Sequence, residues 1–408
     1  MSHTRRNKEL SELRRQGFER HGFSMDPNGV LGSLRALHPT HASFDETKPS
    51  TTQYVRYQWR SRDNRKGRHT LIVPYDHPQR PSRLHTTLAG VKRMLTQFPY
   101  WDVSYWVAVN FVIGSAIFVA SGLFYWLPIA FPSTKFQLES SVGGGVTSFV
   151  GATFFQIGAV LLCFEAVNEN QTGCFGWAVE DLFYRADPAH CEHPHQSQSQ
   201  STSARQGQGQ DQDQGGEGGG AEKPKSTTKR RRRSPAQTSR KWRWWPSWKE
   251  VRTYYIYEIG FLANFSLAIG ATIFYVCGIL SLPGLYGMLS QGVIWGVYYL
   301  TYLVGGLLFV FSSALYMLET QEHWYKPAPR VLGWHIGLWN MIGSVGWTYA
   351  ASLGYCEQHW CEYQSELTLI WASAAFLVGS VLLWFEALDK WTIERGPKNP
   401  KGGRRASA

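Results

Sequence analysis

The chain has 408 residues, of which 43% are hydrophobic and 17% are charged, and its formal net charge is +11. The mean hydropathy of −0.27 averages apolar stretches with long polar segments that carry most of the charge, so it does not describe the folded part. The 18 Trp residues suit a membrane protein, because Trp gathers at bilayer interfaces. No phosphate-binding glycine loop, nucleophile elbow or zinc-protease helix is present, so we expect no enzyme, no catalytic residue, no cofactor and no metal.

The chain begins with a long polar region. Residues 1–80 are basic, with scattered aromatic residues and no long periodic element, and we expect them to be mostly disordered. Residues 81–100 then place Leu84, Leu88, Val91 and Leu95 at helical spacing among basic residues. This pattern predicts a juxtamembrane amphipathic helix on an anionic membrane surface, and the alternative is a helix packed on a soluble partner domain.

Six apolar segments follow, and each approaches the roughly 20 residues needed to cross a bilayer. The fifth is the weakest candidate, because it holds Asn340, Ser344 and several glycines. The predicted fold is an all-α integral membrane bundle of about six helices, arranged as three hairpins over 101–170, 251–320 and 321–390. The spans are expected at about 103–127, 145–168, 255–280, 291–318, 331–354 and 367–389.

The hairpins look like copies of one unit. The segment from Gly158 to Glu165 returns from Gly379 to Glu386, and a weaker copy ends at Glu319. The preceding helices also repeat a glycine followed by a small residue, which lets helix backbones approach closely in a membrane. An internal repeat of a two-helix hairpin is therefore predicted. The paired positions are Gly114-Ser115, Gly270-Ala271 and Gly343-Ser344.

Between the first two hairpins, residues 171–250 form a low-complexity linker that ends in basic and Trp-rich sequence. A nuclear localisation signal conflicts with six spans, and a nucleic-acid interface has no folded platform here, so we expect no nucleic-acid partner. A polybasic segment bound to anionic lipid remains, with a plain solvated linker as its alternative. The expected lipid-binding residues are Lys229, Arg230, Arg231, Arg232, Arg233, Trp242, Trp244 and Trp245.

The distribution of basic residues predicts the topology. The N-terminal region, the linker, the loop with Lys326 and Arg330, and the basic tail over 391–408 all fall on one side of the spans. The positive-inside rule therefore places both termini in the cytosol, in a membrane that the sequence does not specify.

The predicted topology sets the expected state of each cysteine. Cys356 and Cys361 share the last outer loop, where a disulfide is expected, and a metal site using His359 is the alternative. Cys174 would lie on the cytosolic side as a free thiol.

Three carboxylates stand out as candidate functional groups. Glu165, Glu319 and Glu386 lie near the cytosolic ends of spans two, four and six, and Asn110 and Asn340 approach the same level to complete a candidate polar cluster. Ionisable groups in a membrane are costly and often functional, so the carboxylates could ring a cation or proton path. The alternative is that they reach interfacial water or cap a neighbouring helix. The predicted function is a non-enzymatic scaffold or lipid-interacting protein, with a transporter or channel as the alternative; a homo-oligomer is compatible with either.

The hairpin motifs resemble a known family. Gly114-Ser115, Gly158-Ala159, Gly343-Ser344 and Gly379-Ser380 together resemble the YrhK-like domain, a short two-helix membrane module of prokaryotes and of larger fungal integral membrane proteins. The middle copy departs, with Ala271 and Ser312-Ser313 at the matching places. The resemblance implies a membrane location and a hairpin fold, but no activity and no site residues.

Overall fold

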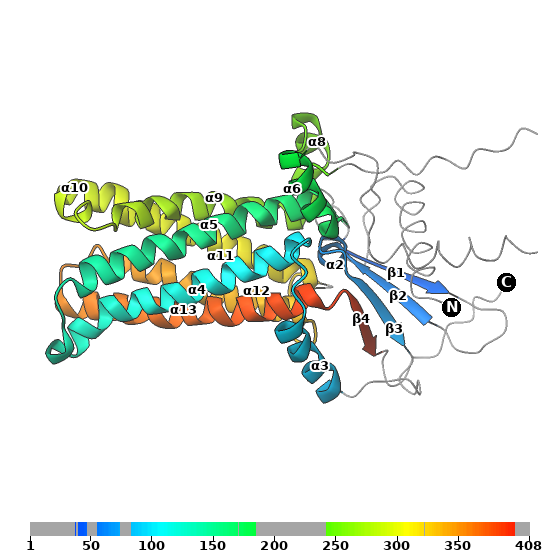
Figure 1. Ribbon diagram of the computed structural model, residues 1–408, viewed down its shortest axis with the longest axis horizontal. Coiled ribbons are helices and arrows are strands. Elements are labelled where there is room, and N and C mark those ends of the chain that lie inside the picture. Colours follow the sequence, from blue (N-terminus) through cyan, green and yellow to red (C-terminus); the bar gives the residue numbers. More distant parts are fainter. Residues whose placement is uncertain are drawn as a thin grey trace, which may run out of the picture.

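The computed structural model is a long helical bundle with a small β-sheet at one end (Figure 1). It describes residues 37, 40–46, 55–73, 83–169, 171–184, 242–321 and 323–395. The polybasic run at 229–233 therefore lies outside the described residues. We call the two ends of the bundle the sheet end and the disulfide end, after the β-sheet at one and the Cys356–Cys361 bond at the other.

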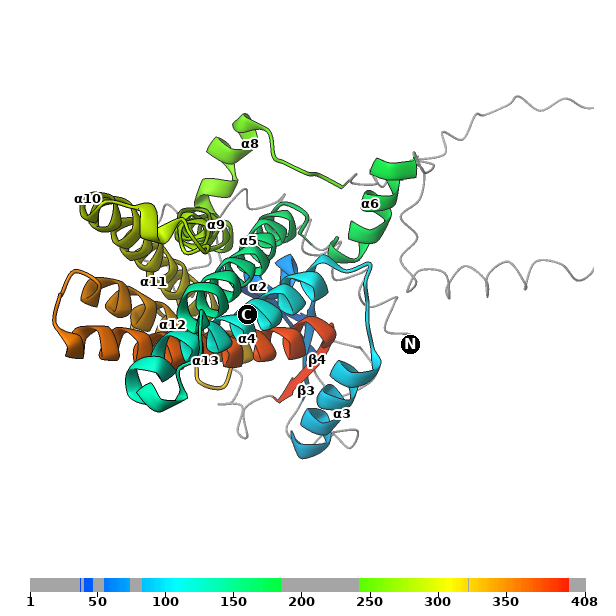
Figure 2. The same cartoon turned by 60° about the vertical axis from the view of Figure 1, so that its left-hand side comes forward.

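Six long helices run side by side along the bundle (Figures 1 and 2). Apolar residues dominate each of these helices. A helix of this composition is not stable alone in water, so it must pack on other helices or face lipid. Their contacts follow the order α4, α5, α9, α11, α12, α13 and back to α4, so the six close into a ring. The helices are α4 (Val103–Ala130), α5 (Gly145–Val167), α9 (Ile259–Leu280), α11 (Leu300–Thr320), α12 (Leu332–Leu353) and α13 (His359–Leu388).

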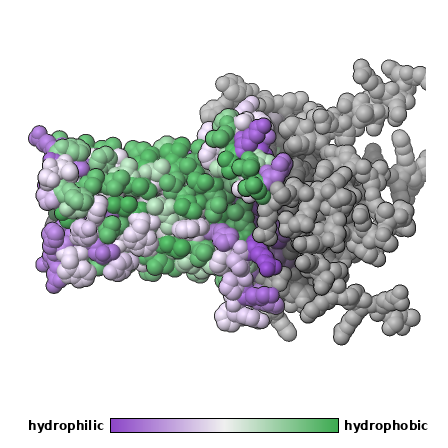
Figure 3. Space-filling model, turned by 90° about the horizontal axis from the view of Figure 1, so that it is seen from below, coloured by the Kyte–Doolittle hydropathy of each residue, from purple (hydrophilic) through white to green (hydrophobic). Residues whose placement is uncertain are grey.

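Five of these helical segments are long and apolar enough to cross a membrane. They include α5 extended through the π-helical turn η2 (Glu139–Gly144), and α11 extended through α10 (Gln291–Val293) and η6 (Ile294–Tyr299). Helix α12 is not among the five, in keeping with its polar residues, although it packs between α11 and α13. Figure 3 shows hydrophobic surface over the middle of the bundle and hydrophilic surface at its far end and beside the sheet end.

Aromatic rings fill the middle of the ring of helices. Phe118, Phe274 and Trp347 each follow, by four residues, the glycine of the small-residue pair in α4, α9 and α12. Trp347 is almost fully buried and stacks on Phe274, with ring centroids 4.6 Å apart. Phe155, Phe309 and Phe376 come from α5, α11 and α13, and all three lie against Trp347. The centre of the bundle is thus packed with rings in offset and edge-to-face contacts, which stabilise beyond simple burial.

The small glycines make this packing possible. A methyl group on Gly114 would meet the ring of Phe155 at 2.9 Å, and one on Gly343 would meet the ring of Phe376 at 2.6 Å. A methyl group on Gly270 would come within 3.1 Å of both a ring atom of Phe309 and a backbone oxygen. In each hairpin, a glycine of the first helix therefore accommodates a phenylalanine of the second.

A four-stranded sheet lies at the sheet end, and the all-α prediction is wrong in omitting it. Strands β1 (His41–Glu46), β2 (Val55–Arg60) and β3 (His69–Val73) are antiparallel neighbours, and β4 (Trp391–Arg395) pairs with β3 in parallel. The short helix α2 (Ser61–Arg65) joins β2 to β3. Three strands thus come from the region that we expected to be mostly disordered, and β4 comes from the basic tail.

Three further short helices surround the sheet end (Figure 1). Helix α3 (Arg83–Thr96) packs on α13, and α6 (Phe175–Tyr184) and α8 (Trp248–Thr253) lie at the two edges of the predicted linker. Ser247 and Glu250 form a capping box that starts α8. Each described edge of residues 171–250 thus contains a short helix. Single turns complete the chain at η1 (Pro132–Thr134), η3 (Thr172–Cys174), η4 (Tyr255–Tyr257) and η5 (Tyr286–Met288).

Candidate functional site

The three predicted carboxylates meet at the sheet end of the bundle. Glu165, Glu319 and Glu386 lie in the last turns of α5, α11 and α13, and each is 0% exposed. In each helix the glutamate follows, by ten residues, the phenylalanine that packs on Trp347. A buried carboxylate is costly unless a cation or several donors face it, so their partners define the site.

Those partners come from α2 and the turn after it. Lys66 Nζ lies 3.2 Å from Glu165 Oε1. Arg65 holds Glu319 with both terminal nitrogens, one of them at 3.0 Å. Arg62 donates from Nε and Nη2 to the two oxygens of Glu386, at 3.0 and 2.8 Å.

Each of the three helices thus has its glutamate paired with a different cation from α2 or the turn after it. Residues 62, 65 and 66 stand three and four positions apart, so one helical turn projects them toward neighbouring positions. Strands β2 and β3 hold that turn from either side. We call Ser61–Arg65, together with Lys66, Gly67 and Arg68, the basic turn.

A second layer of charge surrounds these pairs. Arg68 Nη1 lies 2.8 Å from Asp63 Oδ1 and 3.0 Å from Glu386 Oε1. Ser61 Oγ donates to Glu319 at 3.0 Å, and Ser104 Oγ donates to Glu165 at 2.7 Å. The four buried cations Arg62, Arg65, Lys66 and Arg68 thus face the four buried carboxylates Asp63, Glu165, Glu319 and Glu386.

Burial and pairing act in opposite directions on the pKa values of the basic turn. Burial lowers the pKa of Arg65, but attraction to Glu319 outweighs it, and the pKa is raised above the ordinary value. The pKa of Arg62 is raised in the same way by Glu386. For Lys66 burial dominates the attraction of Glu165 and Glu386, and its pKa is lowered.

The carboxylate of the basic turn, Asp63, shows the same opposition. Burial would raise the pKa of Asp63, but Arg68 and Arg60 hold it below the ordinary value.

The basic turn and the residue before it, Arg60, also contact the ends of the bundle helices: the segment after α13 and the start of α4. Arg60 donates to both oxygens of Glu394 in β4, at 2.7 and 2.8 Å. Lys390 lies 2.7 Å from Asp102, the residue that caps α4, and donates to the backbone oxygen of Lys66 at 2.8 Å. The contacts of Arg60 with Glu394 and of Lys66 with Lys390 join segments more than 300 residues apart in the sequence, which explains how β4 reaches the strands of the N-terminal region.

The predicted asparagines do not join the charged cluster. Asn110 and Asn340 each donate to the backbone oxygen four residues earlier in their own helix. Asn340 lines the cavity below the basic turn, whereas Asn110 does not. Asn264, on α9, has the more central role, because it bridges to the backbone of Leu162 at 2.8 Å and accepts from Tyr316.

The predicted lipid-binding tryptophans separate into two groups. Trp242 is buried, and together with Trp244 it packs against Phe175, while Trp244 also meets Phe164. This burial corrects the expected lipid contact of Trp242, because its ring is used inside the protein. Trp245 is 60% exposed and Trp248, which starts α8, is 67% exposed.

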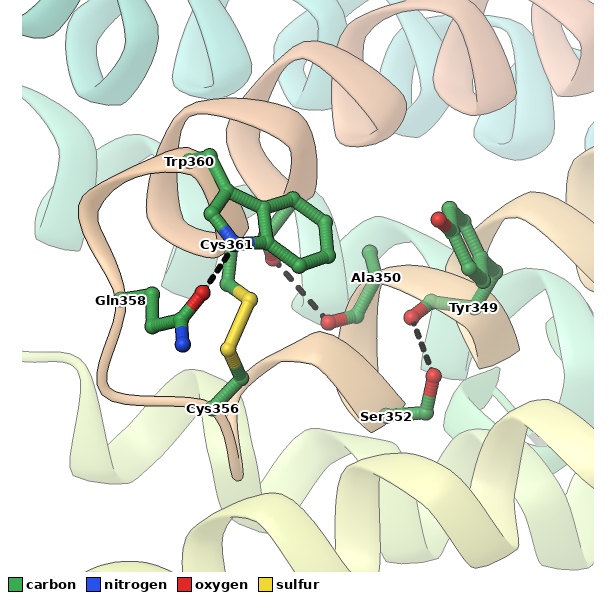
Figure 4. The surroundings of a disulfide bond; sticks show 8 residues. Tyr349, Ala350, Ser352, Cys356, Gln358, Trp360 and Cys361 are labelled. Carbon is green, nitrogen blue, oxygen red and sulfur yellow. Dashed lines mark hydrogen bonds between the residues drawn. A yellow bond between two sulfur atoms is a disulfide. The ribbon is translucent and has the colours of Figure 1, made fainter.

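The disulfide end contains the predicted Cys356–Cys361 bond (Figure 4). Bonded sulfurs are not available as thiolate ligands, which removes the metal alternative with His359. Among the described residues, no group of three or more His, Cys, Asp or Glu side chains could hold a metal ion. Ser365 Oγ from α13 donates to the backbone oxygen of Ala350 at 3.0 Å and helps to close this loop onto α12.

Cys174 differs from its prediction as a free thiol, because it is disulfide-bonded. It lies at the sheet end, next to the start of α6. Since both ends of the bundle hold a bonded cysteine, the cysteines do not tell which end faces an oxidising compartment.

Comparison with known proteins adds no relative: no family model matches the chain, and neither the curated proteins nor the solved structures give a match. The resemblance to the YrhK-like domain therefore stays a prediction. The described helices do show that the chain has the features of a multi-pass membrane protein.

Proposed function

We propose that this protein is a non-enzymatic membrane scaffold, in which a ring of six membrane-spanning helices fixes a small sheet domain at the membrane surface. The observation that carries the proposal is that cations of the basic turn form ion pairs with all three carboxylates, Glu165, Glu319 and Glu386. A scaffold needs a fixed relation between its membrane part and its exposed part, and three buried ion pairs supply one. Both termini would then lie in the cytosol, as the distribution of basic residues predicts.

The spacing of residues that the three hairpins share supports this design. Each hairpin supplies a glycine, an aromatic residue four positions later, a phenylalanine on the second helix and a glutamate ten positions after that phenylalanine. The spacing is shared by all three hairpins, including the middle one with its weaker sequence match. We infer that the hairpins are copies of one unit, related to the YrhK-like module, and that the three glutamates are the repeated attachment points.

A lipid-binding surface would belong to the same role. Helix α3 presents Leu84 and Leu95 at 70% and 72% exposure, and Leu88 and Val91 complete the same stripe. Its opposite side packs on α13, where a methyl group on Gly90 would collide with the ring of Phe385. The helix has no acidic residue in its first turn and carries the exposed Lys92, whereas Arg93 pairs with Asp389 at 3.0 Å. These features favour an anionic leaflet as the partner of α3, with exposed Trp245 and Trp248 as further anchors.

A transporter or channel is the second candidate, and one observation favours it. A cavity of about 40 Å³ lies on the axis of the ring directly below the basic turn, and it is lined by Arg62, Arg65, Lys66 and Glu165 among others. Two features favour the scaffold instead. Cations of this chain already occupy the carboxylates, and aromatic rings fill the axis.

A flux measurement separates the two candidates. Purified protein in liposomes is compared with the variants Arg65→Met and Glu319→Gln, which weaken the hold on the basic turn. The scaffold predicts no proton or monovalent-cation flux above empty liposomes for any of the three. Flux through the wild-type protein, or flux that begins only when the basic turn is loosened, would favour the transporter.

A proteolysis experiment tests the attachment itself. Arg62, Arg65 and Lys66 are buried, so trypsin should not cut within residues 60–68 of the intact protein. In Glu319→Gln the basic turn should open more often, and cleavage mapped by mass spectrometry should appear at these residues. The matched control is Glu362→Gln, an exposed glutamate on α13. Equal cleavage in the wild-type protein and in Glu319→Gln would contradict the proposed attachment.

A further inference from the structure

The cavity below the basic turn lies between all six long helices. Every one of the six long helices contributes to its wall, and the basic turn forms its roof. Its floor is formed by Phe155, Phe309 and Phe376, the rings that pack on Trp347. Much of the wall is apolar, but the polar lining groups gather near the roof and along α11, α12 and α13.

Several buried polar atoms around this cavity lack a partner. Arg65 Nε and Glu165 Oε1 accept or donate no hydrogen bond, although both atoms are inaccessible to outside solvent and Glu165 Oε1 lies 3.2 Å from the ammonium of Lys66. Lys66 carries three protons on Nζ, and its one hydrogen bond goes to Glu165 Oε2 at a long 3.3 Å. Donors therefore outnumber acceptors here, and at least one carboxylate oxygen also needs a donor.

Water is the ligand that suits this set. It accepts from an ammonium or guanidinium group and donates to a carboxylate, and as a neutral molecule it leaves the balance of buried charges unchanged. A monovalent anion would satisfy the donors but would add an unbalanced charge to a buried site, which is costly. The volume of about 40 Å³ is room for roughly three waters, at the 10–15 Å³ that one occupies on this measure.

We infer that this cavity is a hydration site, in which an enclosed cluster of about three waters completes the hydrogen bonds of Lys66 and Glu165. Ser313, Asn340 and Ser344 on the wall give the cluster further polar neighbours. The cluster keeps the Lys66–Glu165 pair solvated although both side chains are buried. This inference goes beyond the scaffold role and does not depend on it.

A double-mutant cycle tests the inference, because a filled cavity should change the unfolding temperature differently with and without the charged pair. Leu383→Phe adds volume from the apolar wall and should expel water from the cavity. In the wild-type protein this removes the water partners of Lys66 and Glu165 and leaves only the direct pair and Ser104, so the unfolding temperature should fall. In a Lys66→Met, Glu165→Gln background the charges that need water are gone, and the same substitution should lower the unfolding temperature much less or raise it. Steric strain from the larger side chain is common to both backgrounds and cancels in the cycle.

Equal effects of Leu383→Phe in the two backgrounds would overturn the hydration site, because a dry cavity has no coupling to the charged pair. A second measurement stands if the background variant does not fold. In a wild-type structure at a resolution that shows ordered water, peaks are expected within hydrogen-bond distance of Lys66 Nζ and Glu165 Oε1. A cavity without density, or a single peak that bromide replaces, would also overturn the proposal; the second result would identify an anion site.

Discussion

Different interactions stabilise the two ends of the bundle. At the sheet end, buried ion pairs join residues 99 to 324 positions apart, and the basic turn depends on them from three sides. At the disulfide end, a covalent bond joins two cysteines five positions apart, and the surrounding loops carry exposed residues such as Trp360 and Met288. The sheet end, where Cys174 is also disulfide-bonded, thus has a network of long-range ion pairs, whereas the other end has a local covalent link alone among the features compared.

This difference bears on which end responds to change. Buried charges are stable only as complete sets, so the loss of one member leaves another charge without a partner. A local covalent link limits only the few residues that it encloses. We therefore expect substitutions at the sheet end to have large effects that spread to the sheet, and substitutions at the disulfide end to stay local.

The largest effect is expected for Glu386→Gln. This carboxylate accepts from Arg62 and Arg68 and lies 4.0 Å from Lys66, so its loss leaves buried cations unbalanced. The free energy of unfolding should fall by about 3–5 kcal/mol, measured by denaturant or thermal unfolding in detergent. Glu362→Gln on the same helix is the control and should change little. Because the residues interact, Arg62→Met combined with Glu386→Gln should cost less than the sum of the two single changes. Additive costs would show that the pair is not coupled.

A smaller effect at the same end is expected for Asp63→Asn, and it should depend on pH. Asp63 accepts from Arg68 at 2.8 Å and from Thr70 at 3.0 Å, and hydrogen bonds to charged groups contribute about 1.5–3 kcal/mol. Its pKa in the folded protein lies below the ordinary value of 3.8. The stability from the carboxylate is therefore fully present above pH 3.8 and is lost as the pH falls through the lower, folded pKa.

The measurement is the unfolding free energy of wild type and Asp63→Asn, from neutral pH to below 3.8. The two curves should be separated at neutral pH and should approach each other in acid. Arg60, Arg68 and Glu386 face Asp63 in both proteins, so their titration cancels in the difference. Glu357→Gln, an exposed change at the disulfide end, should give a curve close to the wild type throughout. A constant separation at every pH would contradict the proposed pKa of Asp63.

A third change compares the packed middle of the bundle with the disulfide end. Gly343→Ala places a methyl group 2.6 Å from the ring of Phe376, so the central rings must shift. Overpacking of this kind typically costs about 1–3 kcal/mol of unfolding free energy. Gly296→Ala is the matched control, because nothing lies within 4 Å of the added group. Since alanine favours helix over glycine, the control should be neutral or slightly stabilising by thermal unfolding. Equal losses in both variants would mean that the glycines serve the helices and not the central packing.

Much of the bundle could be predicted from the sequence, because apolar segments about 20 residues long leave few alternatives in a membrane. The glutamates were also found in this way, since single carboxylates stand out in apolar helices. The basic turn was missed. Its residues lie in a region without long periodicity, and a short strand pair with one helical turn gives little local signal.

One signal for the basic turn was nevertheless present. Buried carboxylates need cations, and the helices that carry Glu165, Glu319 and Glu386 contain no Lys or Arg. The cations therefore had to come from elsewhere in the chain, and Arg62, Arg65 and Lys66 have the spacing of a single helical face. Strand β4 had no comparable signal, because its partner β3 lies more than 300 residues away and pairing at that distance leaves no local pattern.

The smallest effect is expected at the disulfide end, where Cys356→Ser or Cys361→Ser opens a loop of only a few residues. Closing so short a loop removes little entropy from the unfolded chain, so the loss should be about 2 kcal/mol or less. The informative readout is tryptic cleavage within residues 60–68, which should remain as slow as in the wild-type protein. Reductant is not an equivalent test, because it also breaks the disulfide bond of Cys174 at the sheet end, whereas Cys356→Ser opens only this loop. If opening the loop instead exposed the basic turn, the two ends would be coupled through the length of the bundle. The central aromatic packing would then have to transmit the change, and Gly343→Ala should weaken that transmission.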